Sequence, residues 1–445
     1  MQSQTLTESL ASFDPEIYGL LQDEIQKQRF NLSLLPTANA VSPFSAYLKG
    51  SIFGNGHLEH YGVHSQLELE KIAAGRAEKL FGAAHAIVRV TDIAAASRVV
   101  FHGLLNAGDT VLSFNRRKFE HCSGGQMQYN FLSFCIEPDT EQVDLDRVEQ
   151  LARAEKPQLI IYSPVNYPRS LDYARLKEIA AGVGAYLWVD ISQNAGAVAA
   201  GCAPTPVPFA DVVTFPTGDS LHGPQGAVIL TTEALAGQMD KTVLDTGHSM
   251  VKKNVLAALA TSFLEADSET FKEYCLQVLK NAKALEQGLR DAGVKTLCGD
   301  TESHLVLACL PAGETAENMA EKMGQAGFMV KGDNMLTSDK GKSFPILRLS
   351  VLDPTTRAMK EASLQAVGRL IGEIILTGGA EAAQKKAKTQ IRTILLDKPL
   401  FSEEWLPQSI NLTPGYGQRD LNISREVEAE KQEAQAERMW SFWDN

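Results

Sequence analysis

The sequence has no run of about 18 consecutive apolar residues, which is the length that a helix needs to cross a bilayer. Its first residues, Met1–Gln4, are not followed by the basic and then apolar regions of a secretory signal peptide. We therefore expect neither a membrane span nor a signal peptide, and we expect the protein to act in the cytoplasm.

Cysteine is scarce, and no two cysteines have the CxxC spacing of a redox motif or a zinc ribbon. Scattered cysteines are typical of reduced thiols in a cytosolic protein, so we expect neither disulfides nor a zinc ribbon. The six cysteines are Cys122, Cys135, Cys202, Cys275, Cys298 and Cys309.

The chain also lacks an excess of positive charge. Its 54 acidic residues outnumber its 42 lysines and arginines, which gives a formal net charge of -12. This balance argues against nucleic acid or an anionic membrane surface as the main partner. A hydrophobic content of 44% and a charged content of 22% are ordinary for a globular protein, and 445 residues suffice for two or three domains.

Short apolar runs alternate with helical patterns through the middle of the chain. The segment 66–81 has the apolar spacing of an amphipathic helix, and a further helix is expected over 171–183. Nearly continuous apolar strands that alternate with helices are typical of a buried, mainly parallel sheet, so we expect an α/β fold. The strand candidates are 110–114, 159–162, 186–190, 212–214 and 227–230, and the last two form a hairpin-like pair.

The two ends of the chain differ from its middle. Residues 1–30 resemble a helical arm, in which Asp14 is expected to cap a helix that starts at Pro15. Strand candidates 305–308 and 346–349, flanked by helical patterns, indicate a smaller α+β domain. We therefore expect a helical arm, a large α/β domain, a small α+β domain and a C-terminal extension. Their expected limits are 1–30, 31–275, 276–395 and 396–445.

Three motifs follow one another in a fixed order. They are AYLWVDISQNAGAVAAG at 185–201, APTPVPFAD at 203–211 and GDSLHGPQG at 218–226. In this order they resemble the serine hydroxymethyltransferases, and the resemblance runs from about residue 12 to about residue 395. It implies fold type I of the pyridoxal-phosphate (PLP) transferases, with a mixed, mainly parallel seven-stranded sheet and a smaller C-terminal α+β domain. It also implies a homodimer with active sites at the interface.

Several functional positions of that family are retained. Asp190 matches the aspartate that pairs with the pyridine nitrogen of PLP, and His121 matches the histidine that stacks on its ring. Arg348 matches the arginine that clamps the substrate carboxylate, a task that suits a planar guanidinium. Asn39, and Gln193 where the family has a histidine, are further candidates for substrate binding. The alternative for Asp190, His121 and Arg348 is a structural role, as a buried polar group or an ion pair.

The amine that defines the family is missing. Where the family has His-Lys before Gly-Pro, with the lysine forming a Schiff base, this chain has Gly218 and Asp219. Only an amine can add to the cofactor aldehyde and then lose water, so Asp219 cannot form that bond. We instead regard Asp219 as a candidate for acid-base catalysis, together with His121 and Asp190.

Other replacements agree with this loss. Ala38 stands where the family has a glutamate that moves protons, so ordinary folate-linked chemistry is not expected. Asp92 stands where the family has the loop that binds the cofactor phosphate, and its negative charge there would repel a dianion. Gln225 replaces an arginine, and the residues 246–250 replace a glycine-rich loop that reaches the phosphate. PLP and folate are therefore both doubtful cofactors.

The segment HLEHYGVH at 57–64 brings three histidines and a glutamate together. These side chains are the usual ligands of zinc and non-haem iron, so one hypothesis is a metal centre in the vacated cofactor site. Asp92, Asp219 and either His222 or His248 could lie near the same pocket. The alternative is that the histidines are solvated loop residues. The candidate ligands are His57, Glu59, His60 and His64.

Three functions remain open. The first is an enzyme that acts on an amino-acid-like or carboxylate substrate by PLP-free chemistry, with or without a metal. The second is a transferase that uses unanchored PLP or pyridoxamine phosphate, and the third is a non-catalytic partner subunit. A relocated amine at Lys118, Lys252 or Lys253 is a further alternative. The aromatic C-terminus, with Trp440 and Trp443, is expected either to pack on the protein or to recruit a partner protein.

Overall fold

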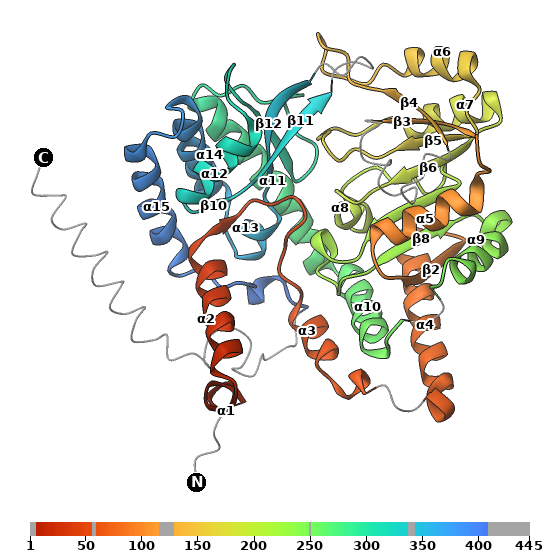
Figure 1. Cartoon of the computed structure of the whole chain (residues 1–445), viewed down its shortest axis with the longest axis horizontal. Coiled ribbons are helices and arrows are strands. Elements are labelled where there is room, and N and C mark those ends of the chain that lie inside the picture. Colours follow the sequence, from red (N-terminus) through yellow and green to blue (C-terminus); the bar gives the residue numbers. More distant parts are fainter. Residues whose placement is uncertain (1–5, 56–58, 115–128, 249–250, 337–342, 408–445) are drawn as a thin grey trace, which may run out of the picture.

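The computed structural model describes residues 6–55, 59–114, 129–248, 251–336 and 343–407, of which the side chains of 6–8, 59–65 and 336 are not described. The chain forms two main parts that lie side by side (Figure 1). One part is built on a seven-stranded sheet and the other on a three-stranded sheet. This is the expected α/β architecture with a second, smaller part.

The seven-stranded sheet has the order β2-β8-β7-β6-β5-β3-β4. Four of its neighbouring pairs are parallel, and β8 is antiparallel to both β2 and β7, so the sheet is mixed and mainly parallel as expected. The hairpin-like pair is β7 with β8. The strands are β2 (His85–Val90), β3 (Thr110–Phe114), β4 (Asn130–Phe134), β5 (Leu159–Tyr162), β6 (Tyr186–Asp190), β7 (Val212–Pro216) and β8 (Ala227–Thr231).

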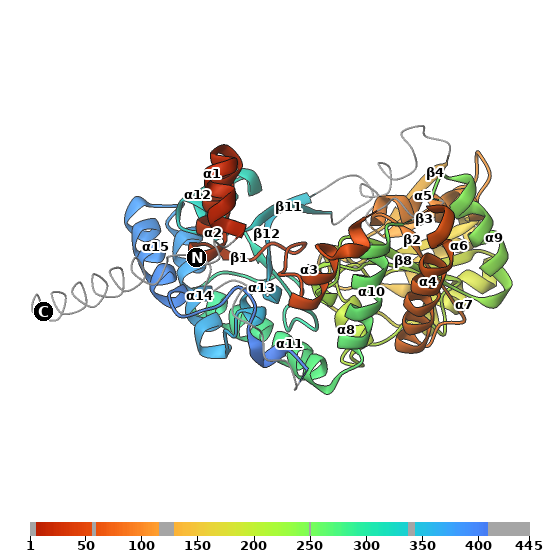
Figure 2. The same cartoon turned by 90° about the horizontal axis from the view of Figure 1, so that it is seen from below.

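Helices cover both faces of this sheet (Figures 1 and 2). They are α3 (Pro43–Lys49), α4 (Glu59–Phe81), α5 (Ile93–Leu104), α6 (Leu145–Glu155), α7 (Tyr173–Val183), α8 (Ala195–Ala199), α9 (Glu233–Asp245) and α10 (Lys253–Ala266), with short 3-10 turns η1 (Ile52–Gly54) and η3 (Asp219–Leu221).

The central strands are buried on both faces because their sequences are almost wholly apolar. All four side chains of β5 are fully buried. Ile161 belongs to a core cluster with residues of α5 and α9, whereas Ile160 belongs to a second cluster with residues of α4, α6, α7 and α10. Since successive side chains of a strand point to opposite faces, the sheet lies between two layers of helices.

Helix starts follow the expected capping chemistry in part. The Asp14 carboxylate accepts a hydrogen bond from the Ile17 backbone nitrogen at 3.1 Å, which caps α2 (Pro15–Phe30) as the sequence predicts. Helix α4 begins at Glu59, well before the expected start at residue 66. The histidine-rich segment after residue 58 is therefore helical rather than a loop.

The smaller part is an antiparallel sheet of order β11-β12-β9 with helices packed against it. Its elements are β9 (Leu305–Cys309), α12 (Ala316–Gln325), β11 (Lys331–Leu336), β12 (Ser343–Ser350), α13 (Leu352–Thr356), α14 (Glu361–Leu376) and α15 (Glu381–Leu395). A two-stranded parallel pair of β1 (Leu32–Ser33) and β10 (Phe328–Met329) joins the N-terminal segment to this part.

Helix α11 (Glu269–Asp291) runs along α14 with very close backbone contact. The two helices meet at Gly288 and Gly368, where an added Cβ atom would lie 2.1 Å and 2.4 Å from a backbone oxygen of the other helix. Only glycine allows this approach. The domain boundary expected at 275 falls inside this continuous helix, so the expected division stays a prediction.

The N-terminal arm and the start of the C-terminal extension both pack on the smaller part. The arm comprises α1 (Leu6–Phe13) and α2, and Arg357 donates to the carbonyl oxygens of Gln28, Arg29 and Asn31 at the end of α2. Near η4 (Glu403–Trp405), the Trp405 indole donates to the Thr355 carbonyl at 2.7 Å. Most of the expected C-terminal extension, including Trp440 and Trp443, lies outside the described residues. No helix in the described part is long and apolar enough to span a bilayer.

Candidate functional site

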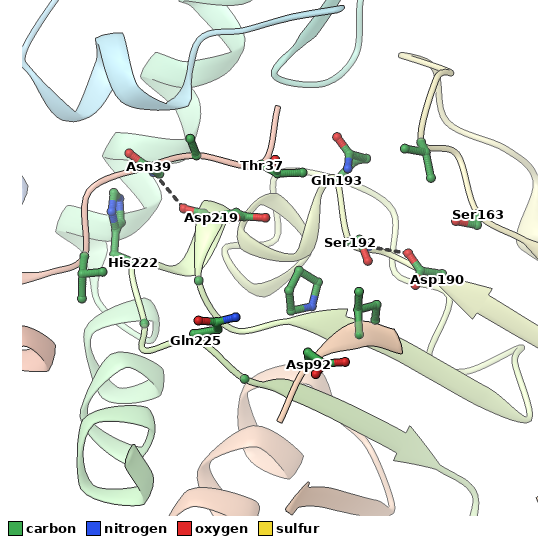
Figure 3. Close-up of a pocket in the computed structure, with 18 of the residues that line it drawn as sticks. Thr37, Asn39, Asp92, Ser163, Asp190, Ser192, Gln193, Asp219, His222 and Gln225 are labelled. Atoms are coloured by element: carbon green, nitrogen blue, oxygen red, sulfur yellow. Dashed lines mark hydrogen bonds between the residues drawn. The ribbon is translucent and has the colours of Figure 1, made fainter. Parts of the chain in front are cut away.

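A cavity of about 600 Å³ opens where strands of the large sheet end (Figure 3). Ser163 follows β5, Asp190 ends β6 and Pro216 ends β7, and all three residues line it. The carboxyl ends of parallel strands are the usual place for ligands in open α/β sheets. The sequence motifs at 185–201 and 218–226 therefore meet in one cavity.

Asp190 is a buried carboxylate held in a fixed orientation. Its Oδ1 accepts from the Ser192 backbone nitrogen at 2.9 Å, and its Oδ2 accepts from the Thr214 hydroxyl at 3.1 Å. The Trp188 indole donates in turn to the Thr214 oxygen at 2.9 Å. Such an oriented carboxylate at the cavity wall can accept a hydrogen bond from an N–H group of a ligand.

Asp219 begins the turn η3, with a backbone φ of +29°, and it also lines the cavity. Burial raises the pKa of its carboxyl to about 6, although its own backbone amide acts in the opposite direction. A carboxyl group that titrates this close to neutral pH can give and take protons under physiological conditions. Figure 3 shows Asp219 across the cavity from Asp190.

Asn39 fixes the turn that carries Asp219. Its amide nitrogen donates to the Asp219 carbonyl at 2.8 Å and contacts the Tyr274 hydroxyl at 3.2 Å. Its amide oxygen accepts from the Ala40 backbone nitrogen at 2.9 Å and from the Thr356 hydroxyl at 2.8 Å. Both ends of the amide are thus engaged within the protein, and substrate binding by Asn39 stays a prediction.

His222 lines the same cavity and is neutral. Burial lowers the pKa of its ring to about 4, and its Nδ1 lies 2.8 Å from the Ala40 carbonyl oxygen. A neutral ring beside a carbonyl carries its proton on Nδ1, which leaves Nε2 as an acceptor. This buried Nε2 has no hydrogen-bond partner among the described residues. Tyr274 and Phe401 pack edge-on against the ring, at centroid distances of 4.7 Å and 5.1 Å.

Asp92 closes the N-terminus of α5 from inside the cavity. Its Oδ1 accepts from the Ala95 backbone nitrogen at 2.7 Å, and the Thr91 hydroxyl lies 3.2 Å from Oδ2. Asp92 thus acts as the helix cap, which the sequence did not lead us to expect. The carboxyl side chains of Asp92, Asp190 and Asp219 all line the cavity, whereas none of the described residues around it is lysine or arginine.

Arg348, in β12, is buried and lies beside the cavity rather than among its described lining residues. Its Nη1 is 3.6 Å from the Asp333 carboxylate, and its Nη2 is 3.5 Å from the Gln193 amide oxygen. Gln193 does line the cavity, so it stands between the cavity and Arg348. Substrate binding by Arg348 and Gln193 stays a prediction.

Asp333 and its partner Asn166 were not predicted from the sequence. The Asn166 amide nitrogen donates to Asp333 at 3.0 Å. In the β11-β12 register, Asp333 lies opposite Ile346, and Lys331 lies opposite Arg348. Asp333 is therefore placed diagonally from the arginine on the neighbouring strand. The only available signal was the alternation of side chains between the two faces of β11. This alternation places Asp333 near Arg348 only when the register between β11 and β12 is known, and the sequence does not reveal that register.

Several predicted residues cannot be placed at this site. His121 lies in 115–128 and His57 in 56–58, both outside the described residues, and the side chains of Glu59, His60 and His64 are not described either. His248 is described but does not line the cavity. Within the described part of the chain, no three histidine, cysteine, aspartate or glutamate side chains gather to hold a metal ion. Asp92, Asp219 and His222 therefore share the cavity without forming such a group.

Comparisons with known proteins cover the residues around this cavity. The family model described as serine hydroxymethyltransferase matches residues 10–371. The chain is also 35% identical over 410 residues to a serine hydroxymethyltransferase of Myxococcus xanthus (strain DK1622), and the match covers 88% of this chain and 98% of that protein. The chain therefore belongs to the serine hydroxymethyltransferase family.

Proposed function

We propose that this chain is an enzyme that acts on an amino-acid-like or carboxylate substrate in the central cavity without an internal aldimine. Enzymes of this family are transferases that normally use PLP and folate. The proposal is therefore a departure from the family's ordinary glycine hydroxymethyl transfer. The observation that carries it is the set of side chains around the cavity, which includes three carboxyl groups and, among the described residues, no amine and no guanidinium.

The fit of PLP to this cavity is poor at two of three points. Asp190 suits the cofactor because an oriented carboxylate stabilises a protonated pyridine nitrogen. Asp219 does not suit it, because a carboxyl group cannot form the imine. Asp92 does not suit it either, because its charge lies at the helix N-terminus where a phosphate would bind. These three points together support a site that has lost tight PLP binding.

Asp219 is the best candidate for the acid-base group of the replaced chemistry. Its pKa of about 6 lets it exchange protons near neutral pH, and its carbonyl is fixed by Asn39. His222 also lines the cavity, and its neutral ring has an Nε2 acceptor that is buried and has no partner among the described residues. Ala38 also lines the cavity and offers no acid-base group, which supports the loss of folate-linked proton transfer.

The second candidate is an enzyme that uses unanchored PLP or pyridoxamine phosphate, and Asp190 favours it. Hydrogen bonds from Ser192 and Thr214 hold its carboxylate in an orientation that suits a pyridine nitrogen. In a metal-dependent form of the first candidate, the segment 57–64 would supply the metal ligands, and the cavity carboxylates would lie near the metal. A non-catalytic partner subunit is the remaining alternative.

Pairing with a second copy of the chain is also part of the proposal, since enzymes of this family are typically homodimers or tetramers. Several large apolar side chains of the N-terminal region are exposed. Phe13 in α1 is 88% exposed, Tyr47 in α3 is 74% exposed and Ile52 in η1 is 80% exposed. We take these side chains as candidates for the contact with a second chain.

The test is an absorbance spectrum and a metal analysis on one sample of the purified, tag-free protein. The proposal expects no band from bound PLP, either as isolated or after PLP is added and removed by gel filtration. About one equivalent of zinc or iron would select its metal-dependent form. A PLP band would overturn the proposal in favour of the unanchored cofactor. Stable pairing with an active homologue, with no turnover by this chain, would overturn it in favour of the partner subunit.

A further inference from the structure

Arg348 is a buried cation whose charge is balanced from inside the protein. It is 4% exposed, and its closest carboxylate is that of Asp333, 3.6 Å from Nη1. Burial lowers the pKa of the guanidinium, and Asp333 acts in the opposite direction. A buried charge without a partner is strongly destabilising, so the presence of this carboxylate has a physical reason.

The ion pair lies in the small sheet, and a residue of the large part supports it. Asp333 and Arg348 come from neighbouring strands of the small sheet, where they sit diagonally in the β11-β12 register. Asn166 comes from the loop after β5 in the large part, and it donates to the same Asp333 oxygen at 3.0 Å. A carboxylate that accepts a hydrogen bond from Asn166 and also pairs with Arg348 is held in place rather than left to rotate in solvent.

The arginine nevertheless keeps unused hydrogen-bonding capacity. Its Nε has no partner within the described part of the chain, and the Nη2 contact to Gln193 is long at 3.5 Å. Gln193 lines the cavity, so its side chain separates the guanidinium from the cavity. The guanidinium therefore has the chemistry of a carboxylate site, with an internal carboxylate already present.

We propose that Asp333 is an internal ligand that occupies Arg348, so that the carboxylate of an incoming substrate must displace Asp333 before it can pair with the arginine. Asp333 would then be a specificity-determining residue of the site. This role of Asp333 rests on the proposed function in one respect, namely that the substrate carries a carboxylate. Since the competing carboxylate is part of the chain, weak binding of simple carboxylates follows directly.

The first test replaces the internal ligand with an external one. In Asp333→Ala we expect a lower melting temperature than in the wild type, because Arg348 loses its charge partner. Sodium formate, exchanged for sodium chloride at constant ionic strength, should restore much of that loss. The formate concentration that gives half of the rescue in Asp333→Ala should be at least tenfold lower than the concentration that first changes the melting temperature of the wild type. Thermal unfolding followed by fluorescence measures both quantities.

Two further variants make this result specific to Arg348. Asp291→Ala removes a carboxylate that pairs with Arg369 at 2.9 Å on the surface, and formate should not rescue it. Asp333→Ala combined with Arg348→Met should also show no rescue. Equal formate effects in Asp333→Ala and Asp291→Ala would overturn the proposal, and so would rescue of the double variant.

A second substitution covers the case in which Asp333→Ala does not fold. Asp333→Asn keeps the shape of the side chain and the oxygen that accepts from Asn166. Calorimetry should show at least tenfold tighter glycine binding by this variant than by the wild type, and an equal affinity would contradict the proposal. A PLP band in the absorbance spectrum would overturn the proposed function but leave these tests readable, because formate reports on Arg348 alone.

Discussion

The carboxylate of Asp92 accepts a hydrogen bond from the backbone nitrogen of Ala95 at 2.7 Å, so the first turn of α5 is closed by an anion from the chain itself. A helix N-terminus attracts phosphate because its free N–H groups and its dipole favour negative charge. Asp92 uses one of these groups and adds its own charge at the cavity wall. This single side chain thus opposes phosphate binding in two ways.

Replacing Asp92 with serine should therefore make the cavity accept phosphate. Serine retains the helix cap but removes the negative charge. We expect Asp92→Ser to bind inorganic phosphate about tenfold more tightly than the wild type, which corresponds to ~1.4 kcal/mol. Titration calorimetry at constant ionic strength measures the change. The matched control is Asp144→Ser, because Asp144 caps α6 in the same way but does not line the cavity. A similar gain in both variants would contradict this account.

Asp219 should make the protein less stable as its carboxyl ionises. Its pKa is raised from 3.8 to about 6 in the folded chain, so the folded state holds a proton that the unfolded state has already released. Stability from this group is complete below pH 3.8, declines as the pH rises toward 6, and is absent above it. Asp219→Asn removes the ionisation, and asparagine tolerates the positive φ of this position.

Urea unfolding of Asp219→Asn and the wild type, compared from pH 4 to pH 8, measures this effect. The variant should gain stability over the wild type as the pH rises, and the difference should level off at about 3 kcal/mol above pH 7. Asp300→Asn is the control, since Asp300 also has a positive φ of +53° but an exposed side chain. A difference that does not change with pH would show that the Asp219 carboxyl is not buried in this manner.

The exposed apolar side chain of Ile52 should contribute to pairing of two chains. Ile52→Glu places a charge on that surface, and a charge that is buried without a partner opposes association. We expect the variant to dissociate at concentrations at least tenfold higher than the wild type, as measured by light scattering after gel filtration. Leu376→Glu, at the end of α14, is a control of similar chemistry because Leu376 is also exposed. A dimer unaffected by Ile52→Glu, or a wild-type monomer, would contradict this prediction.

The sequence was sufficient for the elements whose pattern is local. The apolar run of β5 and the Asp14 cap were predicted correctly because burial on two faces and capping each leave a signature in neighbouring residues. The start of α4 was missed because polar residues and histidines at 59–64 carry no apolar helical spacing. The expected fold type needed the resemblance to a family, since apolar runs alone do not give the strand order.

The candidate site was predictable only where its residues lie in recognisable motifs. Asp190 and Asp219 were found in this way, and the structure places both at one cavity. The pairing of Asp333 with Arg348 was not predictable, because it depends on the register between two strands and on Asn166, which lies far away in the sequence. The capping role of Asp92 was also missed, since the resemblance directed attention to the charge of the residue and not to its backbone neighbours.

The central claim is that no lysine of this chain forms an imine with PLP at the cavity. The most direct measurement is incubation of the full-length protein with excess PLP, reduction with borohydride, and mass spectrometry of the intact chain and its peptides. We predict only scattered, substoichiometric labelling of surface lysines, equal to that of a heat-unfolded sample. One PLP adduct per folded chain at a single lysine, such as Lys118, Lys252 or Lys253, would contradict the account.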